Sequence, residues 1–450
     1  MTYRRLVSAL VLCWVLSAGT ALGQPLVRQE VSSLSATQVA AYRKGVAAMK
    51  ARPATDPTSW LYQANMHGTF DTPAQAAWSS CEHFSEFFLS WHRMYLYYFE
   101  RILRKASGSS TFALPYWNYS RPAGRKLPVI FRQPASETTN PLYVQKRAVN
   151  GGQSLPAQAT SFADALGEPL FFSDTAPSFS GNIEGAPHGA VHNLVGGGTG
   201  WMSSFEMAGR DPIFWLHHAN IDRLWESWVQ AGHANPSSGP WMTAKFTFFD
   251  ETGTAKQLSG AEVVDIATQL NYRYDRLETA PGALTTPTSA PQTQQTLGAG
   301  PDGGIQLGAA PGSVDVRLQE GRGQGALIQP PSPSARYVLQ FSSVDAGPGA
   351  YYEIYVNLPG TATNPQPDSP HFAGILSPFG RAHHTEVRPL TMRVDVTRAV
   401  NRLRADNLVA PSPNLRLTFV PRGPQGQTGA LAPPSDMRMR IGGVQLVLVN

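Results

Sequence analysis

Histidine is the residue type whose number and spacing in this sequence suggest chemistry. Eight of the 11 histidines lie between residues 67 and 233. In "PHGAVH", His188 and His192 are four residues apart, which places them on the same face of a helix. In "LHHAN", His217 and His218 are adjacent and project about 100° apart on a helix, so both cannot face one ion. Because copper and zinc favour neutral imidazole ligands, these histidines predict a metal site.

A second group of histidines lies earlier in the chain. His83 and His92 are nine residues apart, so one continuous helix would hold them on opposite faces. If both bind one metal, His83 must precede a helix that Ser85 caps, and His67 is the third candidate. No acidic cluster accompanies them, which argues against a di-iron or di-manganese carboxylate site. The sequence therefore predicts two sets of three imidazole ligands. The first set is His67, His83 and His92. The second set is His188, His192 and either His218 or His217.

Cys81 lies two residues before His83 and is the only cysteine outside the first 20 residues. The N-terminus carries two arginines, an apolar run over residues 6–16 and then small residues up to a predicted cleavage point after Gly23. This pattern is typical of a secretory signal peptide, residues 1–23, whose removal would also remove Cys13. Cys81 would then have no partner for an internal disulfide. It is either a buried apolar thiol or a sulfur with another use.

Charge and hydropathy exclude some classes of function. The formal net charge is +5, and Lys and Arg are scattered rather than clustered, so no basic stripe for nucleic acid is present. Beyond the signal peptide, no segment is apolar enough to cross a bilayer. We therefore expect an exported protein, secreted or periplasmic, that binds neither nucleic acid nor membrane after signal removal.

The helices that would position the histidines follow from periodicity. Residues 89–103 are predicted to form a helix with His92 and Leu96 on one stripe. A second helix is predicted to begin with Asp211 as its cap and Pro212 at its first position, and to continue through "IFWLHHANIDRLWESW".

Asp222 lies one helical turn past His218 in this second helix. Two roles are predicted for its carboxylate. It either orients a metal ligand or forms a salt bridge with Arg210 or Arg223.

The composition changes after residue 280. Residues 281–312 are rich in Pro, Thr, Gln, Gly and Ala and are predicted to be a linker. Beyond them, short β-rich runs separated by Pro and Gly predict an antiparallel β-sandwich over 313–450. The runs are "SVDVRL", "RYVLQF", "YYEIYVN", "MRVDV", "LRLTFV" and "GGVQLVLV".

Several stretches resemble the tyrosinase and catechol oxidase (polyphenol oxidase) family of type 3 copper proteins, which also includes molluscan haemocyanins. "HFSEFFLSWHRMYLYYFE" resembles the first copper motif of the family, and "PHGAVHNLVGG" with "AGRDPIFWLHHANIDRLW" resembles the second. "LPYWNYS" matches a family segment between them. The likeness implies a mainly α fold: a four-helix-bundle dicopper catalytic domain over 24–280, followed by the C-terminal antiparallel β-sandwich domain.

The resemblance also implies the cofactor and its ligands. Two copper ions would form a dinuclear type 3 centre that uses O₂ as co-substrate, with His218 rather than His217 as the last ligand. Fungal and molluscan members carry a cysteine two residues before the second ligand of the first copper and join the two by a thioether bond. The same spacing here implies a Cys81–His83 cross-link.

Four further positions correspond to residues near the family's site. Phe205 aligns with the aromatic gate over the second copper, and Glu184 aligns with a glutamate that holds a water. Asn193 is expected to line the entrance. Gly189 stands where family members that act well on monophenols commonly have asparagine. Because glycine has no side chain to hold a water, weak or absent monophenol hydroxylation is expected.

The function implied by the resemblance is the oxidation of small phenols. We expect a secreted copper oxidoreductase that oxidises o-diphenols to o-quinones with O₂. A haemocyanin-like reversible O₂-binding protein and an o-aminophenol oxidase are the alternatives.

The C-terminal region is expected to control this activity. "YYEIYVNLPG" and "HFAGILSPFG" resemble the domain that shields the site in latent plant polyphenol oxidases. The chain is therefore expected to be latent until a maturation protease cuts the linker and the domain is removed. Phe379, His383 and His384 are the candidates for a residue that plugs the site.

Overall fold

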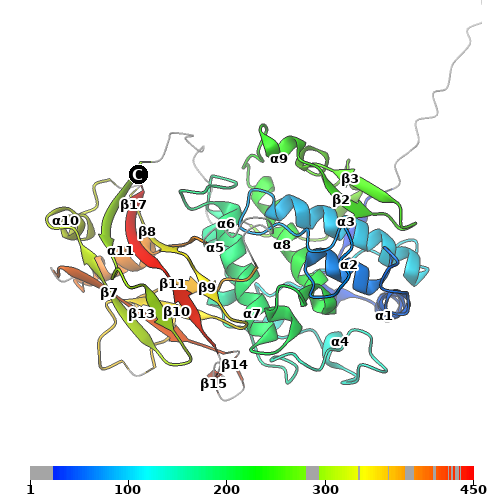
Figure 1. Ribbon diagram of the computed structural model, residues 1–450, viewed down its shortest axis with the longest axis horizontal. Coiled ribbons are helices and arrows are strands. Elements are labelled where there is room, and N and C mark those ends of the chain that lie inside the picture. Colours follow the sequence, from blue (N-terminus) through cyan, green and yellow to red (C-terminus); the bar gives the residue numbers. More distant parts are fainter. Residues whose placement is uncertain are drawn as a thin grey trace, which may run out of the picture.

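The computed structural model describes a mainly helical part followed by a part built on β-sheet, and the two pack against each other (Figure 1). Among the residues that the structure describes, no helix combines the length and the apolar character needed to cross a membrane. The signal peptide predicted over 1–23 lies outside them. The described residues are 24–279, 293–332, 335–362, 364–380, 390–408, 412–423, 425–426, 429–430, 435 and 437–449.

The helical part consists of α-helices joined by short turns of other helix types and by two small sheets. Strand β1 (Leu26–Arg28) pairs in parallel with β4 (Tyr272–Tyr274), and β2 (Phe246–Phe249) pairs antiparallel with β3 (Ala255–Leu258). The α-helices are α1 (Ala36–Lys50), α2 (Trp60–His67), α3 (Phe88–Ser107), α4 (Val129–Arg132), α5 (Ala163–Leu166), α6 (Phe179–Ile183), α7 (Ala190–Gly196), α8 (Pro212–Gln230) and α9 (Pro240–Thr243). The shorter turns are η1 (Val31–Ser33), η2 (Pro122–Arg125), η3 (Gln158–Thr160), the π-helical η4 (Glu184–Gly189), η5 (Trp201–Ser203), η6 (Ala208–Arg210) and η7 (Gly260–Glu262).

Helices α3 and α8 confirm the two helices predicted around the histidines. Helix α3 extends beyond the predicted range at both ends, and its N-cap is Phe87 rather than Ser85. The Ser85 hydroxyl instead accepts a hydrogen bond from the Phe87 N–H (3.2 Å) in the turn before the helix. Helix α8 begins as predicted, because the Asp211 carboxylate accepts from the Ile213 N–H (3.0 Å) and Pro212 is its first residue.

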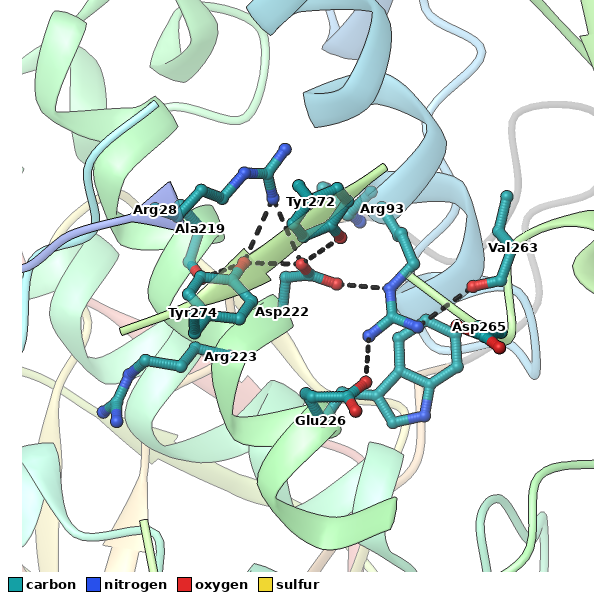
Figure 2. A network of polar contacts seen from close by, with 12 residues as sticks. Arg28, Arg93, Ala219, Asp222, Arg223, Glu226, Val263, Asp265, Tyr272 and Tyr274 are labelled. Atoms are coloured by element: carbon teal, nitrogen blue, oxygen red, sulfur yellow. Dashed lines mark hydrogen bonds and ion pairs between the residues drawn. The ribbon is translucent and has the colours of Figure 1, made fainter. Parts of the chain in front are cut away.

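A buried polar network connects α3 and α8 to β1 and β4, the first and last strands of the helical part along the chain (Figure 2). The Asp222 carboxylate on α8 accepts hydrogen bonds from Arg28 on β1 (3.2 Å) and Arg93 on α3 (2.5 Å). It also accepts from the hydroxyls of Tyr272 (2.6 Å) and Tyr274 (2.5 Å) on β4. One carboxylate therefore joins the first strand, two central helices and the last strand of the helical part.

Both roles predicted for Asp222 are wrong. Among the described residues, its carboxylate contacts neither a histidine nor Arg210 or Arg223. Arg210 pairs instead with Asp71 (2.8 Å), and Arg223 pairs with Glu278 (2.8 Å). The prediction considered only neighbours within and near α8, whereas the partners that bind Asp222 come from distant parts of the chain.

The C-terminal part is antiparallel, as its β-rich runs predict. Its large sheet has the strand order β11-β10-β13-β7-β5-β17-β8-β12, and a smaller sheet has the order β6-β16-β9. The strands of the large sheet are β5 (Gln294–Ala299), β7 (Gly312–Leu318), β8 (Arg336–Ser342), β10 (Tyr352–Val356), β11 (Phe372–Leu376), β12 (Met392–Asp395), β13 (Asn414–Pro421) and β17 (Gly443–Val449). The remaining elements are β6 (Ile305–Leu307), β9 (Asp345–Ala346), β14 (Gln425–Gly426), β15 (Gly429–Ala430), β16 (Met439–Ile441), α10 (Arg322–Ile328) and α11 (Thr397–Ala405).

Two predictions about the C-terminal part need correction. The linker predicted over 281–312 is too long, because β5 and β6 lie inside it and β5 occupies a central place between β7 and β17. "QQTLGA" contains a single large apolar residue, Leu297, which gave no strand signal in isolation. The predicted sandwich of two stacked sheets is one large sheet that curls until its edge strands β11 and β12 come into contact.

The two parts of the chain share a hydrophobic core. Tyr351 and Phe379 come from the C-terminal part, but they belong to the apolar cluster that fills the helical part. Arg336 on β8 reaches across and donates to both carboxylate oxygens of Glu168 (2.6 and 2.5 Å). These contacts hold the C-terminal part against the side of the helical part that contains the histidines.

Candidate metal centre

Two groups of metal-binding side chains lie buried in the helical part. Within each group the candidate ligand atoms all lie within 4.8 Å of one another, and every side chain is buried. The structure thus brings all six predicted ligand residues together in the two predicted sets. The first group is His67, Cys81, His83 and His92, and the second is His188, His192, His217 and His218.

Local structure explains how these side chains converge. His67 is the last residue of α2, and His83 lies in the loop before α3, as its spacing from His92 requires. In η4, Ala186 is extended (φ −149°, ψ 131°) and Pro187 follows it. Since the residue before a proline avoids the helical region, the regular turns that carry His188 and His192 begin at this proline and continue into α7, whereas His217 and His218 lie on α8.

Backbone carbonyls fix the orientation of four imidazole rings. In each case the Nδ1 atom lies at hydrogen-bond distance from a carbonyl oxygen, so Nδ1 carries the proton and Nε2 keeps its lone pair. This is the tautomer in which Nε2 can bind a metal ion. The pairs are His67 with Phe205 (3.0 Å), His92 with Phe88 (2.7 Å), His188 with Glu184 (3.2 Å) and His192 with Met202 (2.8 Å).

Two candidate ligand atoms of these imidazoles lack a hydrogen-bond partner. Among the described residues they are Nε2 of His83 and Nε2 of His188. A buried polar atom without a partner is costly. A metal ion with nitrogen ligands would satisfy these atoms, so the donor set fits a copper or zinc site.

The electrostatic environment keeps these imidazoles neutral. Burial, with the neighbouring histidines, lowers the pKa of His83 and His188 well below the ordinary value for histidine. Burial lowers the pKa of His92 to about 3. Because a protonated imidazole cannot bind a cation, neutral rings are the form that a metal site requires.

The two groups are close enough to act on one small molecule. The rings of His92 and His218 stack with their centroids 4.2 Å apart and 6° between their planes. The centroids of His83 and His188 are 5.3 Å apart. Side chains of one group therefore contact side chains of the other, which is the arrangement expected of two neighbouring ions.

The adjacent histidines of α8 have different surroundings. His218 stacks on His92, and its Nε2 lies 3.2 Å from Nε2 of His192. Nδ1 of His217 lies 3.1 Å from the hydroxyl of Tyr119, and its ring stacks against His188. His218 thus lies between the two groups, whereas the Nδ1 atom of His217 is engaged by the Tyr119 hydroxyl.

Cys81 lies inside the first group. Its sulfur is 3.4 Å from Nδ1 of His83 and also 3.4 Å from Nε2 of His92. Burial raises the pKa of this thiol well above the ordinary value, which opposes formation of a thiolate. The sulfur is therefore placed to meet the His83 ring, and it also faces a nitrogen available to a metal.

Glu184 has a structural role that the sequence did not indicate. Its carboxylate accepts a hydrogen bond from the N–H of Phe84 (2.7 Å), the residue after His83, and its own carbonyl orients His188. Phe84 has a positive φ of 52°. Glu184 thus connects the loop of the first group to the helix of the second, and its burial raises the pKa of the carboxyl.

The structure places the predicted gate residue on the other histidine group. The Phe205 ring lies 4.8 Å from His67 and 5.3 Å from His83, so it covers the first group. The ring over the second group is Phe379, which stacks on His192 with centroids 3.7 Å apart and 7° between planes. Of the three predicted plug residues, Phe379 covers the site, while residues 383 and 384 lie outside the described part of the chain.

Gly189 and Asn193 face the C-terminal part rather than open solvent. A Cβ atom on Gly189 would lie 2.4 Å from the carbonyl oxygen of Ser377. The Asn193 amide nitrogen donates to the carbonyl of Pro378 (2.9 Å) and to the hydroxyl of Ser377 (3.0 Å). In the intact chain neither position lines an open entrance, which differs from the prediction for Asn193.

Comparison with known protein families agrees with this arrangement. The profile of the common central domain of tyrosinase matches residues 57–169 and 128–231, which include both histidine groups. The profile of the polyphenol oxidase middle domain matches residues 237–282. Residues 294–432 match a domain of unknown function.

Individual proteins resemble the chain along nearly its whole length. Tyrosinase HcTyr1 of Hahella sp. (strain CCB-MM4) is 28% identical over 475 residues, which cover 93% of this chain and 98% of that protein. The structure of a latent aurone synthase (polyphenol oxidase) has a TM-score of 0.66 and 23% identity, over 95% of this chain and 90% of that one. A functional unit of octopus hemocyanin has a TM-score of 0.54 and 19% identity, over 94% and 99%.

Proposed function

We propose, since the chain belongs to the type 3 copper family of tyrosinases and polyphenol oxidases, that it oxidises o-diphenols to o-quinones with O₂. The observation that carries this proposal is the pair of buried imidazole groups that meet at His92 and His218. When bound, two copper ions supply the transfer of electrons from the diphenol to O₂. Each diphenol gives up two electrons and two protons, and two diphenols reduce one O₂ to two waters.

Six histidines are proposed to hold the two ions through their Nε2 atoms. His67, His83 and His92 would hold one ion, and His188, His192 and His218 the other. Four carbonyl contacts that leave Nε2 unprotonated support this assignment. His218 is preferred to His217 because its ring lies between the groups, whereas His217 is engaged by the Tyr119 hydroxyl.

Apolar rings packed around the imidazoles would keep water out of the site. Phe88 is packed 4.8 Å from both His92 and His188, and Phe214 is packed 4.3 Å from His218, measured between ring centroids. Both phenylalanines are fully buried. They also prevent the imidazoles from rotating, so the nitrogens stay directed at the ions.

A thioether between the Cys81 sulfur and the ring of His83 is proposed as a covalent support for this ligand. His83 lies on a loop, so no helix restrains its ring. The distance of 3.4 Å from the Cys81 sulfur to His83 Nδ1 supports bond formation at the ring carbon next to that nitrogen. Formation would remove two hydrogens from the protein, and the copper centre with O₂ would be the oxidant.

The chain is proposed to be latent because the C-terminal domain covers the site. Phe379 lies over the second group, 3.7 Å from the His192 ring and 5.6 Å from the His188 ring. Its phenyl ring thus occupies space that a substrate ring would need. A maturation protease that acts near the predicted linker is the proposed partner in activation.

Weak or absent monophenol hydroxylation is also proposed. Hydroxylation first requires a base or an ordered water to take the phenol proton. Gly189 offers no side chain for that purpose, and the Glu184 carboxylate already accepts the Phe84 N–H (2.7 Å). Small phenols remain the substrate class, and export to a secreted or periplasmic location remains the proposed destination.

Oxygen uptake by the copper-loaded chain tests the proposal. With the plug removed by Phe379→Ala, 4-methylcatechol should drive continuous O₂ consumption at two diphenols per O₂. His218→Ala in the same background is the matched control, and it should abolish uptake. A reversible O₂ carrier would bind O₂ once and then stop, and an o-aminophenol oxidase would prefer 2-aminophenol over the diphenol. Either result would contradict diphenol oxidation as the main activity.

A further inference from the structure

Helix α7 has a second functional face beside its metal-binding face. Gly189, Asn193 and Gly197 follow each other at four-residue spacing and so lie on one side of the helix. We call these three residues the docking face. It turns toward the C-terminal part, whereas His188 and His192 turn toward the metal centre.

The centre of the docking face is the Asn193 side chain, which is fully used by the C-terminal part. Its amide nitrogen donates to the carbonyls of Ala350 (3.1 Å) and Pro378 (2.9 Å) and to the Ser377 hydroxyl (3.0 Å). Its oxygen accepts from the Gly349 N–H (3.2 Å). Because Asn193 is 2% exposed, these bonds form in a buried interface where an unmade bond is costly.

Two glycines, Gly189 on the helical part and Gly349 on the C-terminal part, allow the backbones to touch. A Cβ on Gly189 would lie 2.4 Å from the Ser377 carbonyl oxygen. On the opposite side, a Cβ on Gly349 would lie 2.6 Å from the Gly197 carbonyl oxygen, and Gly349 has a φ of +73°. Side chains at these positions would keep the two parts from closing.

Contacts around the docking face have the character of a stable interface. Tyr351 is 0% exposed and Phe379 is 4% exposed, and both are buried in the core of the helical part. Arg336 binds both carboxylate oxygens of Glu168, a bidentate pair near the edge. Buried aromatic anchors surrounded by polar contacts are typical of the residues that carry affinity in protein interfaces.

We infer that the docking face holds the C-terminal domain on the metal site without help from the connecting chain. A cut between the two parts would then leave a nicked protein that is still latent. Activation would need a second event that separates the parts. This inference rests on the proposed latency, and it separates the cut in the linker from the removal of the domain, which the sequence expectation takes together.

The inference can be tested with a specific protease site inserted between residues 280 and 292 of the full chain. The copper-loaded protein is cut to completion, passed through a size-exclusion column at micromolar concentration and assayed with 4-methylcatechol. The nicked wild type should elute as one particle with the rate of the uncut chain.

Two variants should weaken docking from opposite sides. Asn193→Asp keeps the shape of the side chain but places a carboxylate against the carbonyls of Ala350 and Pro378. Gly349→Ala adds the clashing Cβ from the C-terminal part, outside the metal site. Each should raise the dissociation constant of the nicked pair by about tenfold or more. Asn401→Asp is the matched control. Among the described residues, this exposed side chain makes one hydrogen bond, which it accepts from Arg404 (2.7 Å), and an aspartate can still accept it.

The outcomes separate this inference from the proposed function. If the nicked wild type falls apart on the column and its rate rises, the docking inference is wrong and latency stands. If the parts of the Gly349→Ala protein separate and the copper-containing part has no diphenol activity, the proposed function is wrong. If the two variants and the control all stay associated, the docking face does not carry the interface.

Discussion

Replacing Asp222 by Asn should destabilise the helical part without emptying the metal site. The carboxylate is buried and accepts from two guanidinium groups and two phenol hydroxyls (Figure 2). Burial opposes its ionisation, but Arg93 and Arg28 together with the tyrosine hydroxyls lower its pKa below the ordinary value. The native protein therefore contains a charged Asp222 that balances two buried arginines.

The size of the effect follows from what the partners lose. Arg28 keeps the Glu100 carboxylate (2.8 Å), and Arg93 keeps the Val263 carbonyl (3.0 Å), so neither is left without an acceptor. The buried charge balance is lost, and removal of one partner from such a pair costs about 3–5 kcal/mol. For a domain of this size that corresponds to a fall in Tm of roughly 6–20 °C.

Thermal unfolding monitored by near-ultraviolet circular dichroism measures this loss. Asp164→Asn is the matched control, because its ion pair with Arg398 is exposed (64% and 72%) and should contribute no more than about 1 kcal/mol. The contribution of Asp222 is present above the pKa of the unfolded aspartate, about 4, and is lost as the pH falls through the lower native pKa. The unfolding curves of the wild type and of Asp222→Asn should therefore converge in acid. Equal losses for Asp222→Asn and Asp164→Asn, or lost copper at unchanged stability, would refute the reasoning.

Three further predictions concern the metal site. Phe379→Ala should raise the diphenol rate of the intact chain at unchanged copper content; an unchanged rate would show that the ring is not a plug. The peptide that spans Cys81 and His83 should be lighter by two hydrogens in mass spectrometry, and stoichiometric labelling of a thiol would contradict the cross-link. His218→Ala should lower the copper content from two ions to one, whereas His217→Ala should keep two, and the reverse would exchange their roles.

The helices and the histidine sets could be predicted because their signals are local. Asp211 and Pro212 mark the start of α8 within two residues, and the spacing of His83 from His92 requires a break before α3. Local sequence signals could not decide whether His217 or His218 is the ligand. Both project from the same buried segment, and residues distant in the sequence distinguish their surroundings: His92 stacks on His218, and the Tyr119 hydroxyl contacts His217.

Features that depend on long-range contacts could not be predicted. The partners of Asp222 come from residues 194 positions earlier and 52 positions later in the chain, as with Arg28 and Tyr274. Strand β5 has few apolar residues and is defined by its neighbours β7 and β17. Likewise, nothing in the helix sequence indicated that Asn193 would be enclosed by residues 349–350 and 377–378.

The contact between Gly189 and the C-terminal part changes how the predicted monophenol selectivity must be tested. In the intact chain, a Cβ at this position would meet the Ser377 carbonyl oxygen at 2.4 Å and the Glu184 carbonyl oxygen at 3.2 Å. Gly189→Asn should therefore displace the C-terminal domain and raise both the diphenol and the monophenol rate. A higher tyramine rate alone would report an open site, not a new base.

The matched variant Gly189→Ala separates the two effects, because it adds the clashing Cβ without an amide that could hold a water. Ala should raise the rates with 4-methylcatechol and tyramine by the same factor and leave their ratio unchanged. Asn should also raise the tyramine-to-diphenol ratio, by up to about 10²-fold, the lower end of what a positioned base contributes. Equal ratios for Ala and Asn would mean that Gly189 is required for docking and has no part in substrate selection.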